Sequence, residues 1–321
     1  MASKEIFCAH ALIFSLLNKL HLYLTNPKIM MPKPIPSPYP SRRSVLLILF
    51  LITVPLYALV GYFGNLANSK GAVLLGELLL LLPAYLFLHF YHYDIRRIFR
   101  LNLVSRRLVI ISVGLAVAIY LVIYEIDRLL MALWRFAWQV MPPELNLLAP
   151  ENMQAQLEQT LLAHNGLEWA LLIIAPVAIA GIFEEMLFRG FVQTAFEQHH
   201  KMLTALTITA AIFAVNHAAP WWFVQIFLLG LVLGWLARQS DSMIPGAIVH
   251  GLNNLFAVLL VNFKTESQGL FWQNAKLWLG HGHLHPLVWL AAGAAVYFGL
   301  RHFQRCCEEE TEIPTFFNSP K

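Results

Sequence analysis

The chain has 321 residues, of which 58% are hydrophobic and 12% are charged, and its mean hydropathy is +0.61. A soluble domain carries about 25% charged residues, so the charges are too few to cover a soluble protein of this length. The net charge is only +4, and the basic residues lie between hydrophobic runs, so nucleic acid is not an expected partner. The composition predicts an all-α, polytopic membrane protein embedded in a lipid bilayer.

Hydrophobic segments divide most of the chain. A helix needs about 20 apolar residues to cross the roughly 30 Å hydrocarbon core of a bilayer. Eight segments approach or exceed that length, namely Val45–Gly64, Ala72–Phe90, Leu108–Tyr124, Leu167–Phe196, Met202–Ala219, Trp221–Ala237, Met243–Phe263 and Pro286–Leu300. We therefore predict about eight transmembrane helices, with a functional site inside the helix bundle.

Lysine and arginine residues favour one orientation of these helices. With the N-terminus in the cytoplasm, sixteen of them fall in cytoplasmic segments and five in outer segments, while Arg189 lies within a span. Cytoplasmic loops of membrane proteins carry an excess of Lys and Arg. The distribution predicts that both termini are cytoplasmic.

Three regions follow from this division. Residues 1–43 form an N-terminal cytoplasmic segment, either a weak interfacial helix or an upstream start-site artefact before Met30. Residues 44–301 form the transmembrane domain. Residues 302–321 form a cytoplasmic tail, in which we expect the acidic stretch Glu308–Glu312 to be disordered.

The connection between the third and fourth spans is long, covering residues 127–166. Asp127–Val140 is mostly apolar, and Glu151–His164 is amphipathic between Pro150 and Gly166, which are typical helix boundaries. We interpret the connection as interfacial helices on the outer face or as a long extension of the third span.

The fourth span contains a dense group of charged residues. An ionisable side chain in the membrane costs about 2.5–3.5 kcal/mol on insertion scales, so each needs a reason. Glu185 and Arg189 are four residues apart and can neutralise each other on one helix face. Glu184 points about 100° away and has no partner on its own helix, so it must meet another span. The non-catalytic alternative is an ion-pair cluster that holds helices together.

Two further polar groups lie on later spans. His217 follows Phe213 by four residues on the fifth span, and His250 and Asn254 share one face of the seventh. A single buried histidine is usually structural. Two intramembrane histidines together with the unpaired Glu184 favour a shared functional site.

These side chains permit hydrolysis of a peptide bond. A carboxylate and an imidazole, Glu184 and His217, can remove a proton from water, while an imidazole N–H and an amide NH₂ can stabilise an oxyanion. No cofactor is then required. The alternative is a zinc ion held by Glu184, His217 and His250, although the common HExxH signature is absent.

The ordered motifs Glu184-Glu185-xxx-Arg189, Phe213-xxx-His217 and His250-xxx-Asn254 resemble those of the CPBP family of intramembrane proteases. This family includes type II CAAX prenyl proteases and Abi-like bacterial relatives linked to bacteriocin processing. The resemblance covers the core at residues 167–263. It implies an intramembrane endopeptidase, of glutamate type or a metalloendopeptidase, which acts on a membrane-associated protein or peptide, and it suggests the cytoplasmic membrane of a bacterium.

The resemblance also implies a role for each motif residue. Glu184 and His217 would activate the water, and His250 and Asn254 would form the oxyanion site. The supporting residues would be Glu185, Arg189 and Phe213, the last packing beside His217.

Two other functions use the same features. A non-catalytic bacteriocin-immunity or scaffolding protein would keep the fold but would not need the complete motif set. A transporter would use the buried charges for ion movement, but the sequence has no inverted repeat or pair of broken helices to support it.

Overall fold

The computed structural model describes residues 38–66, 70–142, 144–145, 149–266, 278–279 and 283–312. The predicted N-terminal helix or start-site artefact therefore lies outside the described residues. All elements belong to the unit Tyr39–Lys321. The described part of the chain is almost entirely helical, and its only strands are two residues long, so the all-α architecture is confirmed.

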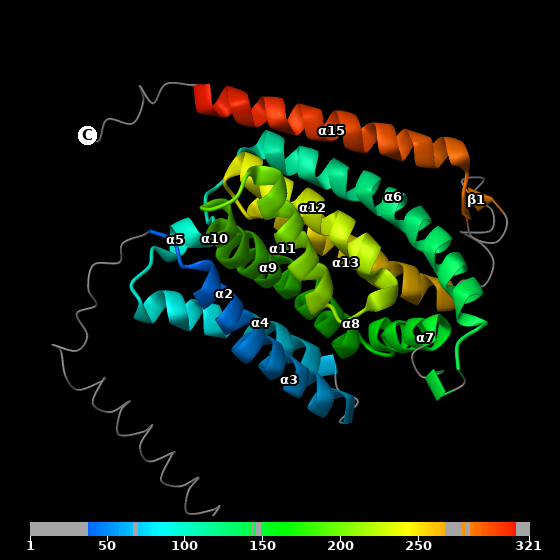
Figure 1. Ribbon diagram of the computed structural model, residues 1–321. Helices are drawn as coiled ribbons and strands as arrows, with labels where there is room; N and C mark the ends of the chain where they lie inside the picture. The colour runs from blue at the N-terminus through cyan, green and yellow to red at the C-terminus, as the bar shows by residue number, and fades with distance from the viewer. Residues whose placement is uncertain are drawn as a thin grey trace, which may run out of the picture. The chain divides into compact units, whose positions relative to one another are not determined.

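The elements follow one another as successive long helices with short connections (Figure 1). In chain order they are α2 (Arg42–Ile48), η1 (Leu49–Thr53), α3 (Val54–Leu66), α4 (Lys70–Phe90), α5 (Ile95–Ile98), α6 (Arg106–Trp138), α7 (Pro150–Leu161), α8 (Gly166–Leu172), η3 (Ile173–Ile179), α9 (Ala180–Glu185), η4 (Met186–Val192), α10 (Gln193–Glu197), α11 (Met202–Asn216), η5 (Pro220–Trp222), α12 (Phe223–Ser240), α13 (Ile244–Glu266), β1 (Trp278–Leu279), β2 (His283–Leu284) and α15 (Pro286–Glu312). The strands β1 and β2 pair antiparallel.

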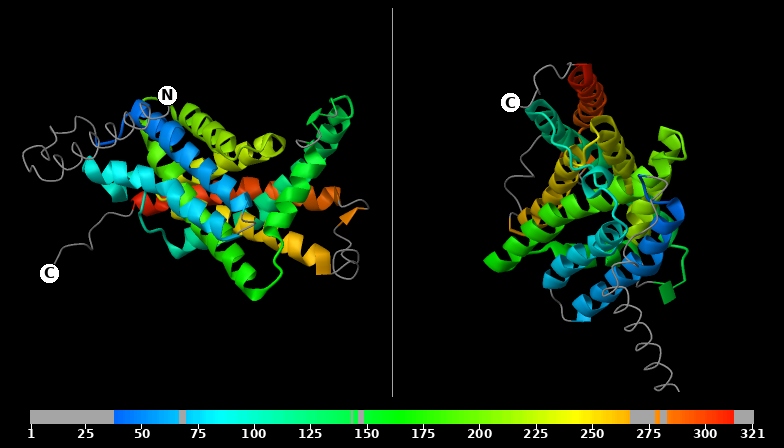
Figure 2. Two further views of the ribbon diagram at one scale, coloured as in Figure 1. Left: turned by 90° about the horizontal axis from the view of Figure 1, so that it is seen from below. Right: turned by 90° about the vertical axis from the view of Figure 1, so that its left-hand side faces the viewer.

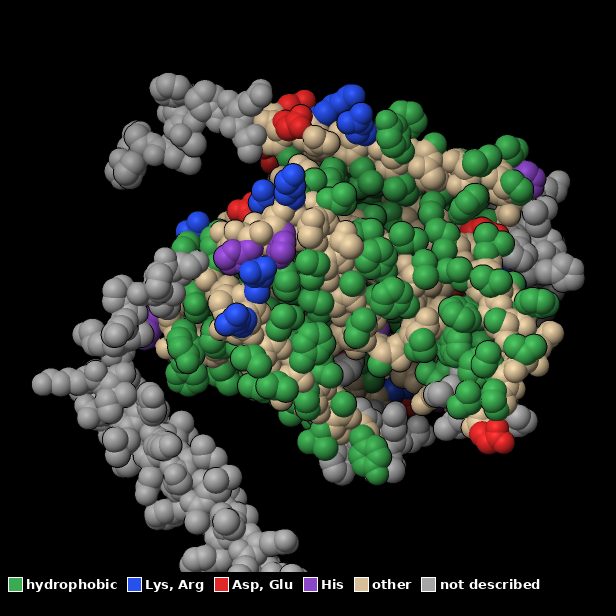
Figure 3. All heavy atoms as spheres, viewed as in Figure 1, with side chains coloured by type: hydrophobic (Ala, Val, Ile, Leu, Met, Phe, Trp, Pro, Cys, Tyr) green, Lys and Arg blue, Asp and Glu red, His purple; other side chains and the backbone are tan. Residues whose placement is uncertain are grey.

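The protein is an integral, multi-pass membrane protein. Among the described residues, six helical segments are long and apolar enough to cross a membrane, and α11 is a shorter apolar helix. Many large apolar side chains on these helices are exposed, for example Ile110 on α6 and Leu51 on η1. Hydrophobic side chains cover most of the face seen in Figure 3, as expected where lipid replaces water.

The eighth predicted span, Pro286–Leu300, begins α15, which is not one of those six segments. Helix α15 lies antiparallel beside α6 along its length (Figures 1 and 2). Leu284, just before α15, donates its backbone N–H to Glu125, and Glu309 near its end lies 3.9 Å from Arg107 at the start of α6. An eighth crossing by α15 remains a prediction, and the packing of α15 along the strongly apolar α6 supports it.

Connections that we predicted to share one side of the membrane do lie together. The polar contacts that join them are Arg42 with His200, Arg97 with Tyr39, Arg100 with Glu197, Asn102 with Asp241, and Arg107 with Glu309. Lys, Arg and His side chains gather in Figure 3 at the end of the visible face where α2, α5 and α10 lie. The contacts support the predicted grouping of loops, and the side of the membrane on which they lie stays a prediction.

The long connection after the third span contains the predicted extension of that span and a separate helix, whose interfacial place on the outer face stays a prediction. Helix α6 continues from the predicted span to Trp138 without a break, so the extension is confirmed. Helix α7 begins at Pro150, whose missing N–H is tolerated in a first turn, and it covers most of the predicted amphipathic segment.

The prediction of a disordered acidic stretch was wrong. Helix α15 continues through Glu308 to Glu312. Phe303 and Cys306 on the same helix are buried against other helices, so packing extends the helix past the membrane-spanning part.

The segment Gly166–Glu197 carries the densest charges and is not a uniform α-helix. Two π-helical turns, η3 and η4, flank the short α9 that holds both glutamates. Pro176 lies within η3 and removes one backbone donor from the helix. Such π-helical turns frequently occur at functional sites because they redirect the side chains that follow.

Candidate active site

Glu184 on α9 meets His217 at the end of α11. Their nearest atoms, Glu184 Oε2 and His217 Nε2, are 3.8 Å apart. Glu184 Oε2 is buried and has no hydrogen-bond partner among the described residues. The expectation that Glu184 would meet another hydrophobic helix is confirmed by this contact.

The end of α11 fixes how the His217 ring is held. His217 Nδ1 lies 2.8 Å from the carbonyl oxygen of Phe213, which can only accept a hydrogen bond, so Nδ1 carries the hydrogen. Ala218 follows with φ 50°, a left-handed conformation that ends the helix. In the neutral ring Nε2 is then an acceptor, and it faces Glu184.

Two acceptors at this spacing suit a water molecule. A water that donates one hydrogen to each of two acceptors holds them about 4.4 Å apart, given O–H···O and O–H···N distances near 2.8 Å. The 3.8 Å between Glu184 Oε2 and His217 Nε2 is slightly shorter than that. The pair can therefore bind a water and take a proton from it.

Glu185 lies at the centre of a second, fully buried group. Its carboxylate accepts a hydrogen bond from Arg189 Nε at 2.9 Å, and its other oxygen lies 3.3 Å from His250 Nδ1 on α13. The predicted pair of Glu185 and Arg189 is confirmed. The bond from His250 to Glu185, rather than to Glu184, is a contact that sequence spacing does not reveal.

Phe213 connects the two groups. Its ring packs edge-to-face against His217, with ring centroids 4.6 Å apart, and against His250 at 5.7 Å. The guanidinium carbon of Arg189 lies 4.5 Å from the centre of the same ring. The predicted packing of Phe213 beside His217 is confirmed, and one aromatic ring sets the positions of both histidines.

Close helix contacts bring α9 and α13 together. A Cβ added at Gly181 would lie 3.1 Å from the Cα of Gly251, and one at Gly251 would lie 2.8 Å from the carbonyl oxygen of Val177. A Cβ at Gly246 would lie 2.6 Å from Glu185 Oε2. Small residues are therefore required where α13 passes the glutamates.

Asn254 lies one turn after His250 on α13, as its spacing predicts. Its Nδ2 donates a hydrogen bond of 2.7 Å to the carbonyl oxygen of Pro176 in η3. This bond fixes the amide and uses one of its two hydrogens, so the second remains for a ligand.

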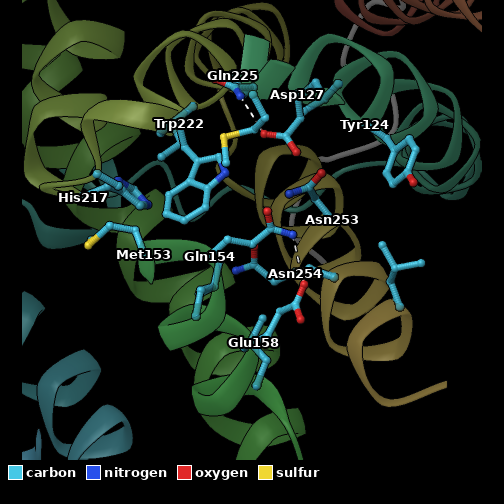
Figure 4. A pocket seen from close by; sticks show the side chains of 18 of the residues that line it. Tyr124, Asp127, Met153, Gln154, Glu158, His217, Trp222, Gln225, Asn253 and Asn254 are labelled. Atoms are coloured by element: carbon cyan, nitrogen blue, oxygen red, sulfur yellow. Dashed lines mark hydrogen bonds between the residues drawn. The ribbon is translucent and has the colours of Figure 1, made fainter. Parts of the chain in front are cut away.

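A cavity of about 1070 Å³ adjoins these residues and is lined by α6, α7, α12, α13 and the end of α11. Four of the predicted site residues line it, namely Phe213, His217, His250 and Asn254. Glu184 is not among the lining residues and reaches the site from α9. Figure 4 shows His217 at one side of this space and side chains of α7, including Gln154 and Glu158, pointing into it.

The three predicted zinc ligands take part in two different polar contacts. The described residues contain no group of three or more His, Cys, Asp or Glu side chains placed to hold a metal ion. Of the three residues predicted for zinc, Glu184 and His217 lie together, while His250 directs Nδ1 to Glu185, which leaves only its Nε2 to bind a metal. As they are placed, the three side chains do not form a metal-binding group.

Comparison with known proteins agrees with the motifs. Residues 166–256 match the family model described as Type II CAAX prenyl endopeptidase Rce1-like. The resemblance to the CPBP proteases is confirmed. The Rce1-like segment runs from the start of α8 into α13 and includes every predicted site residue.

A curated relative aligns with a similar length of chain. The UPF0177 protein YxdF of Lactococcus lactis subsp. lactis (strain IL1403) is 29% identical over 90 residues, which are 28% of this chain and 46% of the relative. The alignment thus spans about half of the relative's length. No solved structure matches the chain.

Proposed function

We propose that the protein is a CAAX-protease-like intramembrane endopeptidase in which Glu184 and His217 activate a water molecule. The observation that carries this proposal is the pair of facing acceptors, Glu184 Oε2 and His217 Nε2, 3.8 Å apart beside a large cavity. The Rce1-like match of the surrounding segment supports the same class of reaction.

The reaction begins with the water between these two residues. One of them takes a proton as the water oxygen attacks the carbonyl carbon of the substrate's peptide bond. When the tetrahedral intermediate breaks its C–N bond, the same group returns the proton to the leaving nitrogen. Since His217 Nδ1 is bonded to the carbonyl oxygen of Phe213, Nε2 is the nitrogen that exchanges the proton.

The oxyanion of the intermediate needs hydrogen-bond donors. We assign this role to His250 and to the second hydrogen of the Asn254 amide, both of which line the cavity. Because His250 Nδ1 donates to Glu185, its Nε2 can donate as well only when the ring is an imidazolium. Glu185 and Arg189 then act as positioning residues, since they hold His250 rather than touch the substrate.

The substrate we propose is a membrane-associated protein or peptide. The cavity adjoins membrane-spanning helices, and its lining combines apolar, amide and charged side chains, as an extended peptide requires. We further propose that the protein resides in a bacterial cytoplasmic membrane with both termini in the cytoplasm, because the clustered loops hold most of the basic residues.

A comparison of membrane proteomes tests the proposal. Peptide termini from cells that express the wild-type protein are compared with those from cells that express Glu184→Gln, His217→Ala or His250→Ala. We expect wild-type termini that each of the three variants lacks, at equal levels of inserted protein. Glu309→Gln, at an exposed site on α15, is the matched control and should retain cleavage.

One outcome would favour a non-catalytic immunity role instead. If wild type and Glu184→Gln yield the same termini, while both protect cells equally against a bacteriocin, the protease proposal is wrong.

A further inference from the structure

The cavity contains a second group of polar side chains on helices α6, α12 and α13, away from the glutamates of α9. Asp127 accepts a hydrogen bond of 2.7 Å from Gln225 Nε2, and Asn253 lines the same space. Figure 4 shows Asp127 and Gln225 side by side, with Asn253 next to them and the indole of Trp222 between them and His217. None of these residues has a role in the proposed hydrolysis.

Unsatisfied acceptors define this end of the cavity. Gln225 is only 4% exposed, and its Oε1 has no hydrogen-bond partner among the described residues. The orientation of its amide is fixed, because a carboxylate accepts and so Nε2 must face Asp127. Asn253 Oδ1 is likewise buried and lacks a partner in the described part of the chain.

Three acceptors in one place call for a ligand rich in donors. Buried polar atoms are normally hydrogen-bonded, so unpaired ones on residues that line a cavity indicate a missing partner. A lysine ammonium offers three N–H donors and an arginine guanidinium five, and neither has an acceptor. The carboxylate of Asp127 adds the negative charge that distinguishes these cations from neutral donors.

We infer that Asp127, Gln225 and Asn253 form a specificity subsite that binds a lysine or arginine side chain of the substrate. The inference rests on the proposed protease function, because the occupant belongs to the peptide that is cleaved. The aliphatic part of the basic side chain would lie against Trp222, whose indole also donates a hydrogen bond to Asp127, and its charged end would reach the same carboxylate.

Two arginines of α6 also line the cavity and must be considered. Arg135 lies 3.1 Å from Glu151 and 3.3 Å from Gln154, so α7 side chains hold it. Arg128 follows Asp127 and projects about 100° around the helix. The positive charge of Arg128 weakens the attraction of Asp127 for a cation, so Arg128→Gln should strengthen the preference for Lys and Arg in the substrate.

Affinity selection tests the subsite without requiring cleavage. Full-length Glu184→Gln protein in lipid nanodiscs is incubated with a synthetic library of random octapeptides, and the bound peptides are sequenced. We expect Lys and Arg to be enriched about tenfold over Leu and Glu at one fixed position, as a charged hydrogen bond would give. Asp127→Asn should reduce this enrichment to about one, and Gln225→Leu should reduce it in part.

Matched controls separate recognition from folding. Glu309→Gln on α15 also removes one negative charge and should leave the enrichment intact, since neither Glu309 nor its partner Arg107 lines the cavity. Thermal unfolding of each variant shows whether it is folded. If Lys and Arg are not enriched, or if Asp127→Asn retains the enrichment, the inference is wrong and the acceptors bind only water.

Cleavage of the same library by the otherwise wild-type protein distinguishes the two proposals. Basic enrichment in binding without any cleavage would uphold the subsite and contradict the protease function. Cleavage of the library with no preference for Lys or Arg in the binding or the cleavage assay would support the protease function and contradict the subsite. Equal enrichment of Gln and Lys would overturn the inference of a charged occupant.

Discussion

His250 Nδ1 lies 3.3 Å from Glu185 Oε1, so the glutamate next to the proposed base holds the proposed oxyanion donor. Replacing Glu185 with Gln keeps an acceptor for His250 but removes the negative charge that stabilises an imidazolium. We expect kcat for peptide cleavage to fall about tenfold or more, with little change in KM, because a hydrogen bond to a charged group is worth about 1.5–3 kcal/mol. Steady-state kinetics on folded protein measure both values, and a change in KM alone would contradict this role.

Arg189 is fully buried with Glu185, and its removal should mainly affect stability. Arg189→Met leaves the carboxylate without its cation, and breaking a buried pair from one side costs about 3–5 kcal/mol. The exposed pair of Arg107 and Glu309 is the matched comparison, and Arg107→Gln should cost at most about 1 kcal/mol. Unfolding in denaturant with the protein in detergent gives both free energies of unfolding. Equal losses of stability in the two variants would contradict a larger contribution from the buried pair.

Gly246 should not tolerate a methyl group. A Cβ there would lie 2.6 Å from Glu185 Oε2, and this oxygen cannot move easily because Arg189 holds it. We expect Gly246→Ala to destabilise the protein by about 1–3 kcal/mol through overpacking and to lower activity through a displaced Glu185. Gly293→Ala is the control, since nothing lies within 4 Å of its added Cβ. Thermal unfolding and cleavage assays should separate the two variants.

Chelation distinguishes the two mechanisms considered from the sequence. Without a three-ligand metal group among the described side chains, we expect cleavage to persist after dialysis against EDTA or 1,10-phenanthroline. A loss of activity that added Zn²⁺ restores would show that Glu184, His217 and His250 rearrange to bind the metal. The Glu184→Gln variant, treated in parallel, gives the background rate.

The positions of the loops can be mapped with introduced cysteines. Cysteines placed at Arg96 and Lys201 should react with an impermeant thiol reagent only from the cytoplasmic side, and one at Met153 on α7 only from outside. The native thiols should give little background, because burial raises the pKa of Cys307 to about 11 and raises that of Cys306 too. If the cysteines at positions 201 and 153 are labelled from the same side, the predicted topology is wrong. Cys8 is replaced by serine in this experiment.

The sequence alone indicated a polytopic membrane protein and predicted the residues of the candidate site. Its low charge required a membrane environment, and the four-residue spacing of Glu185 and Arg189 placed them on one helix face. The same argument left Glu184 needing a partner on another helix. Spacing could also place His250 and Asn254 on one face, since helix periodicity is a local property.

Tertiary structure decided which helices meet. The bond between His250 and Glu185 depends on the close approach of α13 to α9 at Gly181 and Gly251, which no spacing within one helix encodes. The cavity and the acceptors beside Asp127 arise only when α6, α12 and α13 pack together. Contacts between distant segments depend on the packing of whole helix surfaces, whereas the sequence pattern of one helix reports only which face is polar.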